Sequence, residues 1–147
     1  ILRPTTVPRN THKNLKDTGY FTINHIWEDV FEDAHHTSAK YPDDISEFDM
    51  TNLEPEFKGD FNAPFVKNAP VQIAMKFIEE IYVPSNNVML VVAQIQELYV
   101  KDELLQEDGL INLSEGKVVT INGLDTYAVP QFKKQLSYQR PKVIENI

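Results

Sequence analysis

Residues 71–100 limit the possible folds of this chain more than any other stretch. The large apolar residues Val71, Ile73, Met75 and Phe77 occupy every second position of the segment 71–77. This is the period of a half-buried β-strand. The letters PSNN at 84–87 predict a turn, and 88–100 form a second long strand. Two long strands joined by a short turn predict an antiparallel hairpin, and such a hairpin forms the backbone of a barrel or a sandwich.

The second strand of this hairpin differs from the first because Val88 to Ala93 is apolar at consecutive positions. A strand that is apolar on both faces is usually buried on both sides. We therefore expect this strand to be central in its sheet or buried against a partner. After this strand the sequence predicts a helical turn, then a break at Gly109 and a short helix near Leu113.

A strand and a helix are predicted before the hairpin. The β-rich residues 20–23 predict a short strand, and Asn24 is expected to cap a helix that runs to about His36. Trp27 is interpreted as a core residue of that helix, or alternatively as part of a ligand pocket. The spacing predicts that the buried face of the helix consists of Ile26, Trp27, Val30, Phe31 and Ala34.

Residues 43–70 predict a long ordered loop. They are rich in proline, aspartate and asparagine, and their aromatic residues are spaced irregularly. One helical turn is predicted at Ile45 to Phe48. Long ordered loops often serve as lids or interface arms, so a function is expected for this one.

The composition narrows the classes of function. The 147 residues carry a net charge of −8, which disfavours nucleic acid and anionic membranes as partners. There are no cysteines, so disulfides, thiolate nucleophiles and thiolate-held metal clusters are excluded. The adjacent His35 and His36 lack the spacing of a metal site, and no metal is predicted. No apolar run is long enough to cross a membrane, and a cytoplasmic protein is expected.

The first two dozen residues have the layout of an anion pocket. A helix is predicted from Asn10 or Thr11, either of which can be its N-cap, to Gly19. Amides at a helix N-terminus favour a phosphate or carboxylate, and Arg9 adds a bidentate donor beside them. Three hydroxyl donors lie in the same stretch: Thr5, Thr6 and Thr11. The same residues also fit a capped helix with a solvated arginine, and physical chemistry alone favours that simpler interpretation.

Two motifs resemble the flavin reductase-like family, the FMN-binding split barrels that include the flavoredoxins. The first covers the anion-pocket stretch, where the family holds the FMN phosphate. Its matching residues are Arg3, Pro4, Arg9, Thr11, Asn14, Leu15, Thr18, Gly19, Phe21, Ile23 and Asn24. The second is the run H-x-T-S-A-K-Y that ends at Tyr41. The resemblance extends from Arg3 to about Pro141.

This resemblance implies a mainly β fold with short helices, a Greek-key split β-barrel in a single domain over residues 1–147. It implies that front strands of the barrel normally precede Ile1 and are absent from the chain as printed. It also implies a homodimer that binds FMN near the subunit interface, with NADH or NADPH as the second nucleotide.

The resemblance assigns cofactor-binding roles to several residues. Arg9, Thr11 and either Thr5 or Thr6 are expected to hold the FMN phosphate. Ser38 and Lys40 are candidate partners of the phosphate or the ribityl chain, although Lys40 also fits a solvated surface amine. Tyr127 is expected along the cofactor edge, or else as a half-buried strand aromatic.

The function implied by the resemblance is an NAD(P)H-dependent flavin reductase. No side chain accepts a hydride, so the cofactor carries the chemistry and no catalytic residue is assigned. Two alternatives stay open. One is a flavoredoxin-like electron carrier or a non-catalytic FMN-binding module, and the other is a protein that keeps the fold without the flavin.

Overall fold

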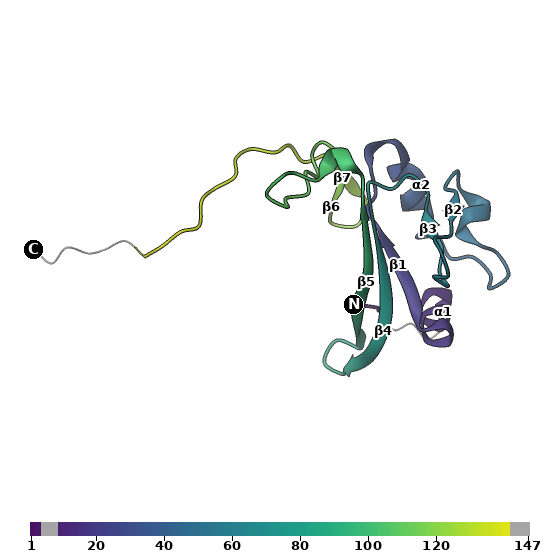
Figure 1. Cartoon of the computed structure of the whole chain (residues 1–147). Coiled ribbons are helices and arrows are strands. Elements are labelled where there is room, and N and C mark those ends of the chain that lie inside the picture. The colour runs from purple at the N-terminus through teal and green to yellow at the C-terminus, as the bar shows by residue number, and fades with distance from the viewer. Residues whose placement is uncertain (4–8, 142–147) are drawn as a thin grey trace, which may run out of the picture.

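The computed structural model describes residues 1–3 and 9–141. They form a mainly β structure with short helices, in which β1 (Tyr20–Asn24), β4 (Val71–Val83) and β5 (Val88–Val100) make an antiparallel sheet in the order β1-β4-β5. Figure 1 shows α1 (Asn10–Thr18), α2 (Phe31–His36) and the small β2–β3 pair on the β1 side of this sheet. Within the described residues the sheet is open, and no barrel closes.

The predicted hairpin is confirmed. β4 and β5 pair antiparallel along their full length, from Val71 opposite Val100 to Val83 opposite Val88. The alternation expected at the start of β4 is only partly correct, because Gln72 and Ala74 are 5% and 0% exposed. Both faces of this end of β4 are therefore covered. The 43–70 loop covers the face that carries Gln72, whose side chain bonds to Val66 and Glu56 of that loop.

The expectation that β5 is central in its sheet is wrong. β5 is an edge strand, and Ile95 and Leu98 remain 58% and 52% exposed. Among the described residues its outer edge is paired at one point, where Met89 exchanges two backbone hydrogen bonds of 2.8 Å with Leu2. The expectation failed because the apolar composition of a strand does not determine which strands lie beside it. The other alternative, that β5 is buried against a partner, stays a prediction.

The predicted strand at 20–23 is confirmed as β1, but the role expected for Asn24 is wrong. Asn24 is the last residue of β1 and pairs with Gln72 instead of capping a helix. The helical segment begins later, with the short 3-10 helix η1 (Glu28–Val30), and continues directly into α2. The five residues of the predicted buried stripe are half-buried, because this short segment is covered on only part of its surface.

The loop at 43–70 contains three short elements. These are the 3-10 helix η2 (Glu47–Met50), β2 (Pro55–Glu56) and β3 (Phe65–Val66). The predicted helical turn is present but starts two residues later, after Ser46, whose side chain accepts a hydrogen bond from the Phe48 N–H. Phe65 is fully buried and packs edge-on against Tyr99 of β5, so it anchors the loop to the sheet.

After β5 the chain forms the predicted helical turn as η3 (Asp102–Leu104), and Leu104 is buried. The predicted helix near Leu113 is not formed. The Leu113 carbonyl accepts from the Val118 N–H across a turn, and Val118 pairs with Trp27. A small hairpin of β6 (Thr120–Asn122) and β7 (Thr126–Ala128) follows, and the described chain then extends away from the sheet (Figure 1). No helix in the described part of the chain is long and apolar enough to cross a membrane.

Candidate functional site

A pocket of about 600 Å³ lies between α1, β1 and the 43–70 loop. This volume falls in the range of small-molecule and cofactor sites. Among the described residues that line it, Glu47 alone is charged, and most of the polar groups are neutral amides and hydroxyls. The polar lining consists of Asn10, Thr11, Asn14, Thr18, Thr22, Asn24, Thr37 and Asn62. The apolar lining includes Leu15, Tyr20, Phe21, Ile26, Phe48, Leu53 and Val66.

Helix α1 forms the most polar wall of this pocket. Asn10, Asn14 and Thr18 are spaced four residues apart, so they lie on one side of the helix, and Thr11 lies beside them. The end of α1 is fixed by Gly19, which adopts the left-handed conformation at φ 72° and donates its N–H to the Leu15 carbonyl. A residue with a β-carbon is strained at this φ, which explains the glycine.

The N-terminus of α1 differs from the prediction. Its N-cap is Arg9, in extended conformation, and not Asn10 or Thr11, which are already helical. The Arg9 side chain makes no capping hydrogen bond, and a guanidinium has no acceptor with which to make one. An anion is therefore an appropriate partner for the first-turn amides, at the end of the helix where Asn10 and Thr11 line the pocket.

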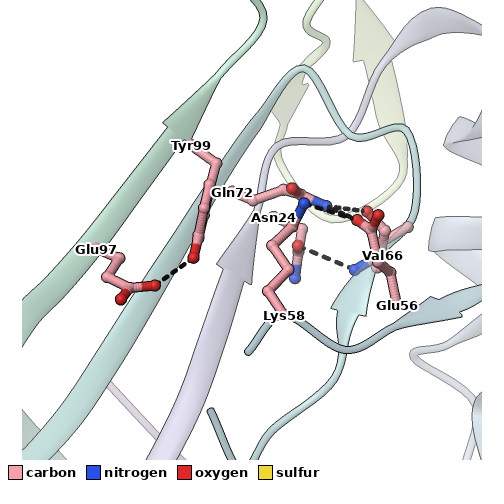
Figure 2. Close-up of polar contacts among 7 residues, drawn as sticks. All are labelled: Asn24, Glu56, Lys58, Val66, Gln72, Glu97 and Tyr99. Carbon is pink, nitrogen blue, oxygen red and sulfur yellow. Dashed lines mark hydrogen bonds and ion pairs between the residues drawn. The ribbon is translucent and has the colours of Figure 1, made fainter. Parts of the chain in front are cut away.

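The opposite wall of the pocket is held by two amide side chains from the sheet. Asn24 Oδ1 accepts from the Val66 N–H at 3.0 Å, and Gln72 Nε2 donates to the Val66 carbonyl at 2.6 Å. Figure 2 shows both side chains converging on Val66 from neighbouring strands. Both main-chain groups of one β3 residue are thus satisfied by the sheet, which fixes the position of the loop that lines the pocket.

We call the two bonds from Asn24 and Gln72 to Val66 the Asn24–Val66–Gln72 clamp. Gln72 also connects this clamp to a small network of charged side chains (Figure 2). Gln72 Nε2 also donates to Glu56 Oε2 at 3.2 Å, and Lys58 lies 3.0 Å from the same oxygen. The hydrogen bond from Lys58 lowers the pKa of Glu56, and the bond from Gln72 adds to the effect. The ammonium of Lys58 also lies 4.7 Å from the ring centroid of Tyr99, so the loop is held to β5 by a cation–π contact.

The phosphate-binding residues predicted from the sequence are placed as follows. Thr11 lines the pocket, and Arg9 is the N-cap of the same helix, two residues before Thr11, with an exposed side chain. Thr5 and Thr6 lie outside the described residues. The structure therefore brings Thr11 and Arg9 to the same end of one helix.

Ser38 and Lys40 lie in the exposed turn after α2, which confirms the predicted helix end and polar turn. Neither residue lines the pocket, but Thr37 of the same turn does. The Thr37 hydroxyl donates to the Ala34 carbonyl at 2.7 Å, which holds the start of the turn against α2. Ser38 and Lys40 thus stand beside the pocket and not within its wall.

Tyr127 lies on β7 and contacts α2. Its hydroxyl is 2.9 Å from His35 Nδ1, and its ring packs against Phe31 with centroids 5.3 Å apart. It does not line the pocket. Its observed role in the described structure is to attach the β6–β7 hairpin to α2.

Sequence reasoning missed several pocket residues. Asn10 was considered as a cap, Asn14 as a motif position, and Asn24 as a motif position and a cap of the next helix, yet all three line the pocket. The spacing of Asn10, Asn14 and Thr18 on one helix face was the available signal. No comparable signal pointed to the loop residues. The described residues contain no group of three or more potential metal ligands.

Comparison with known proteins identifies the fold. A split-barrel protein from Shewanella frigidimarina NCIMB 400 that carries a provisional flavin reductase assignment superimposes with a TM-score of 0.87 at 40% sequence identity, covering 90% of this chain and 67% of that one. The flavoredoxin of Desulfovibrio vulgaris (Miyazaki F) shares the fold with a TM-score of 0.72 at 21% identity, covering 85% of this chain and 67% of that one.

Residues 5–122 match the family described as the flavin reductase like domain. The chain therefore belongs to the flavin reductase-like family, and the predicted split-barrel fold type is confirmed. An uncharacterized protein of Aquifex aeolicus (strain VF5) is 31% identical over 104 residues, which are 71% of this chain. This chain spans 52% of the length of that relative.

Proposed function

We propose that this protein binds FMN in the pocket between α1 and the 43–70 loop and acts as an NAD(P)H-dependent flavin reductase. The observation that carries the proposal is the wall formed by α1, where the N-cap is an arginine without a capping bond and Thr11 enters the pocket. Membership of the flavin reductase-like family supports a flavin as the ligand.

The described residues fit the parts of an FMN molecule. The first-turn amides of α1 and the guanidinium of Arg9 suit its phosphate. The amides and hydroxyls of Asn14, Thr18 and Thr22 suit a polyol such as the ribityl chain, and Tyr20, Phe21 and the other apolar lining residues suit an aromatic ring.

When bound, FMN would supply the acceptor for a hydride from NADH or NADPH. The task of the protein is to bind and orient. Arg9 and Thr11 would fix one end of the ligand, and the Asn24–Val66–Gln72 clamp would keep the opposite wall in place. No proton transfer by a side chain is needed for the hydride step, and no catalytic residue is assigned.

The test is an anaerobic visible spectrum of the purified protein supplied with FMN, before and after addition of NADH or NADPH. A bound flavin that bleaches supports the reductase. A bound flavin that stays oxidised favours the alternative, a flavoredoxin-like electron carrier or FMN-binding module, which the similarity in fold to a flavoredoxin makes reasonable. Absence of flavin binding would contradict both.

We also propose a homodimer and a cytoplasmic location. The far half of the β4–β5 hairpin carries exposed apolar side chains on both strands, and apolar surface of this kind marks protein interfaces. The residues concerned are Ile78, Ile81, Tyr82, Leu90 and Val92. The cytoplasmic location follows from the reduced nicotinamide that the proposed reaction consumes. Sedimentation of the purified protein tests the dimer.

A further inference from the structure

We propose that Glu80 of β4 is a positioning residue for the ligand pocket, because its carboxylate holds helix α1 in the orientation that presents Thr11 and Asn14 to the ligand. The proposal rests on the proposed function, since it concerns the same pocket. Glu80 does not line the pocket itself and would act through α1.

Two residues of α1 converge on the Glu80 carboxylate. His12 Nε2 lies 2.8 Å from Oε2, and Lys16 Nζ donates to Oε1 at 2.8 Å. Both oxygens of one side chain are therefore engaged by two residues one helical turn apart. The Glu80 side chain is 20% exposed, so these contacts are partly shielded from water. Lys16 also lies 5.1 Å from the ring centroid of Phe77, on the same strand as Glu80.

The helix geometry separates these contacts from the pocket. At about 100° per residue, Asn10, Asn14, Thr18 and Thr11 cover one side of α1. His12 and Lys16 lie on a different side, next to Leu15. One side of the helix is thus attached to β4 while another faces the ligand, so the attachment sets how far and at what angle the pocket side chains project.

Among the described residues, α1 makes few other buried contacts that can set this orientation. Within α1, all of which the structure describes, Leu15 is the one buried residue. A helix of nine residues is marginally stable by itself, so tertiary contacts decide its position. The Phe77 N–H donates to the Gly19 carbonyl at 2.9 Å and holds the C-terminal end of the helix to β4. The two bonds to the Glu80 carboxylate, from successive turns, restrict rocking and rotation of the rest of the helix.

The lowered pKa of Glu80 agrees with an attachment of α1 to β4 that persists at neutral pH. The hydrogen bonds from His12 and then Lys16 lower the pKa of Glu80, and the charges of the same two residues add to the shift. The charged form of Glu80 is thus the one that the native helix position favours.

The experiment is a fluorescence titration of the full chain with FMN, comparing wild type with Glu80→Ala, the nearly isosteric Glu80→Gln, and the charge swap Lys16→Glu/Glu80→Lys. We expect Glu80→Ala to weaken FMN affinity about tenfold, the size of effect of one or two charge-assisted bonds. Glu80→Gln should weaken it less, and the charge swap should recover most of the loss. The control is Glu79→Ala, because Glu79 is the exposed neighbour in the same strand.

The rescue by the charge swap and the rate of NADH oxidation at saturating FMN separate positioning from general stability. A positioning role raises the FMN concentration needed for half the maximal rate and leaves the maximal rate within about twofold. Wild-type affinity in folded Glu80→Ala and Glu80→Gln overturns the proposal and leaves the proposed function intact. A wild-type protein that binds no FMN overturns both.

Discussion

The side-chain amide of Asn24 accepts a hydrogen bond from the main-chain N–H of Val66, 42 residues later, over 3.0 Å. The same Asn24 donates from Nδ2 to the Thr22 hydroxyl, which in turn donates to the Pro64 carbonyl. A single strand, β1, therefore fixes two points of the loop that lines the pocket. The relationship connects a residue of the family motif to the wall of the proposed FMN site.

Replacing Asn24 by alanine should destabilise the protein by about 1–3 kcal/mol, because it leaves the Val66 N–H without its acceptor in a half-buried position. FMN affinity should fall with it, since Val66 lines the pocket. Urea denaturation and FMN titration measure the two effects. Asn122→Ala, at an exposed position of β6, is the control and should change neither. Wild-type stability in Asn24→Ala would show that the bond is replaced by water at no cost.

Replacing Arg9 by alanine should weaken FMN affinity about tenfold or more, because a bidentate charge-assisted contact to a phosphate is lost. Stability should change little, since the side chain is exposed. Equilibrium titration with FMN and with riboflavin, which lacks the phosphate, measures the effect. The loss should appear with FMN and not with riboflavin. Arg140→Ala, at an exposed position near the end of the described chain, is the control. Equal affinity of wild type and Arg9→Ala for FMN contradicts the phosphate assignment.

Replacing Tyr127 by phenylalanine tests the role of its hydroxyl. The ring contact with Phe31 remains, while the contact with His35 Nδ1 is lost. Because both side chains are near the surface, we expect a loss of about 1 kcal/mol or less in stability. A Tyr127 that only attaches the β6–β7 hairpin should leave FMN affinity unchanged, whereas one that also contacts the cofactor should lower it. Tyr138→Phe, at an exposed position, is the control.

The ion pairs of Glu80 should make stability depend on pH in the acid range. The pKa of Glu80 lies below its ordinary value of 4.5, so its contribution is complete above that value and is lost as the pH falls through the lowered pKa. Wild type should exceed Glu80→Gln in the free energy of unfolding by about 1 kcal/mol at pH 7, and the difference should vanish in strong acid. Urea denaturation at both pH values measures it. A difference that is independent of pH would assign the effect to packing.

The sequence alone determined the strands, turns and helix ends that depend only on residues close together in the chain. The strand that starts at Val71, the turn at 84–87 and the strand at 88–100 were all predictable, as was the helix end at Gly19. The family could also be inferred from motifs at fixed spacing, and the match over residues 5–122 confirms it. These features depend on backbone preferences and short-range spacing, which the order of residues contains.

The tertiary structure alone decided which side chains meet across the fold. Asn24 is a good helix cap by its chemistry, but the Val66 N–H offers it a partner within the sheet. Gln72 looks like an exposed polar position, but the 43–70 loop buries it and satisfies it. β5 has the composition of a central strand and is an edge strand. Burial and hydrogen-bond partners depend on what packs from distant parts of the chain, and no local pattern encodes that.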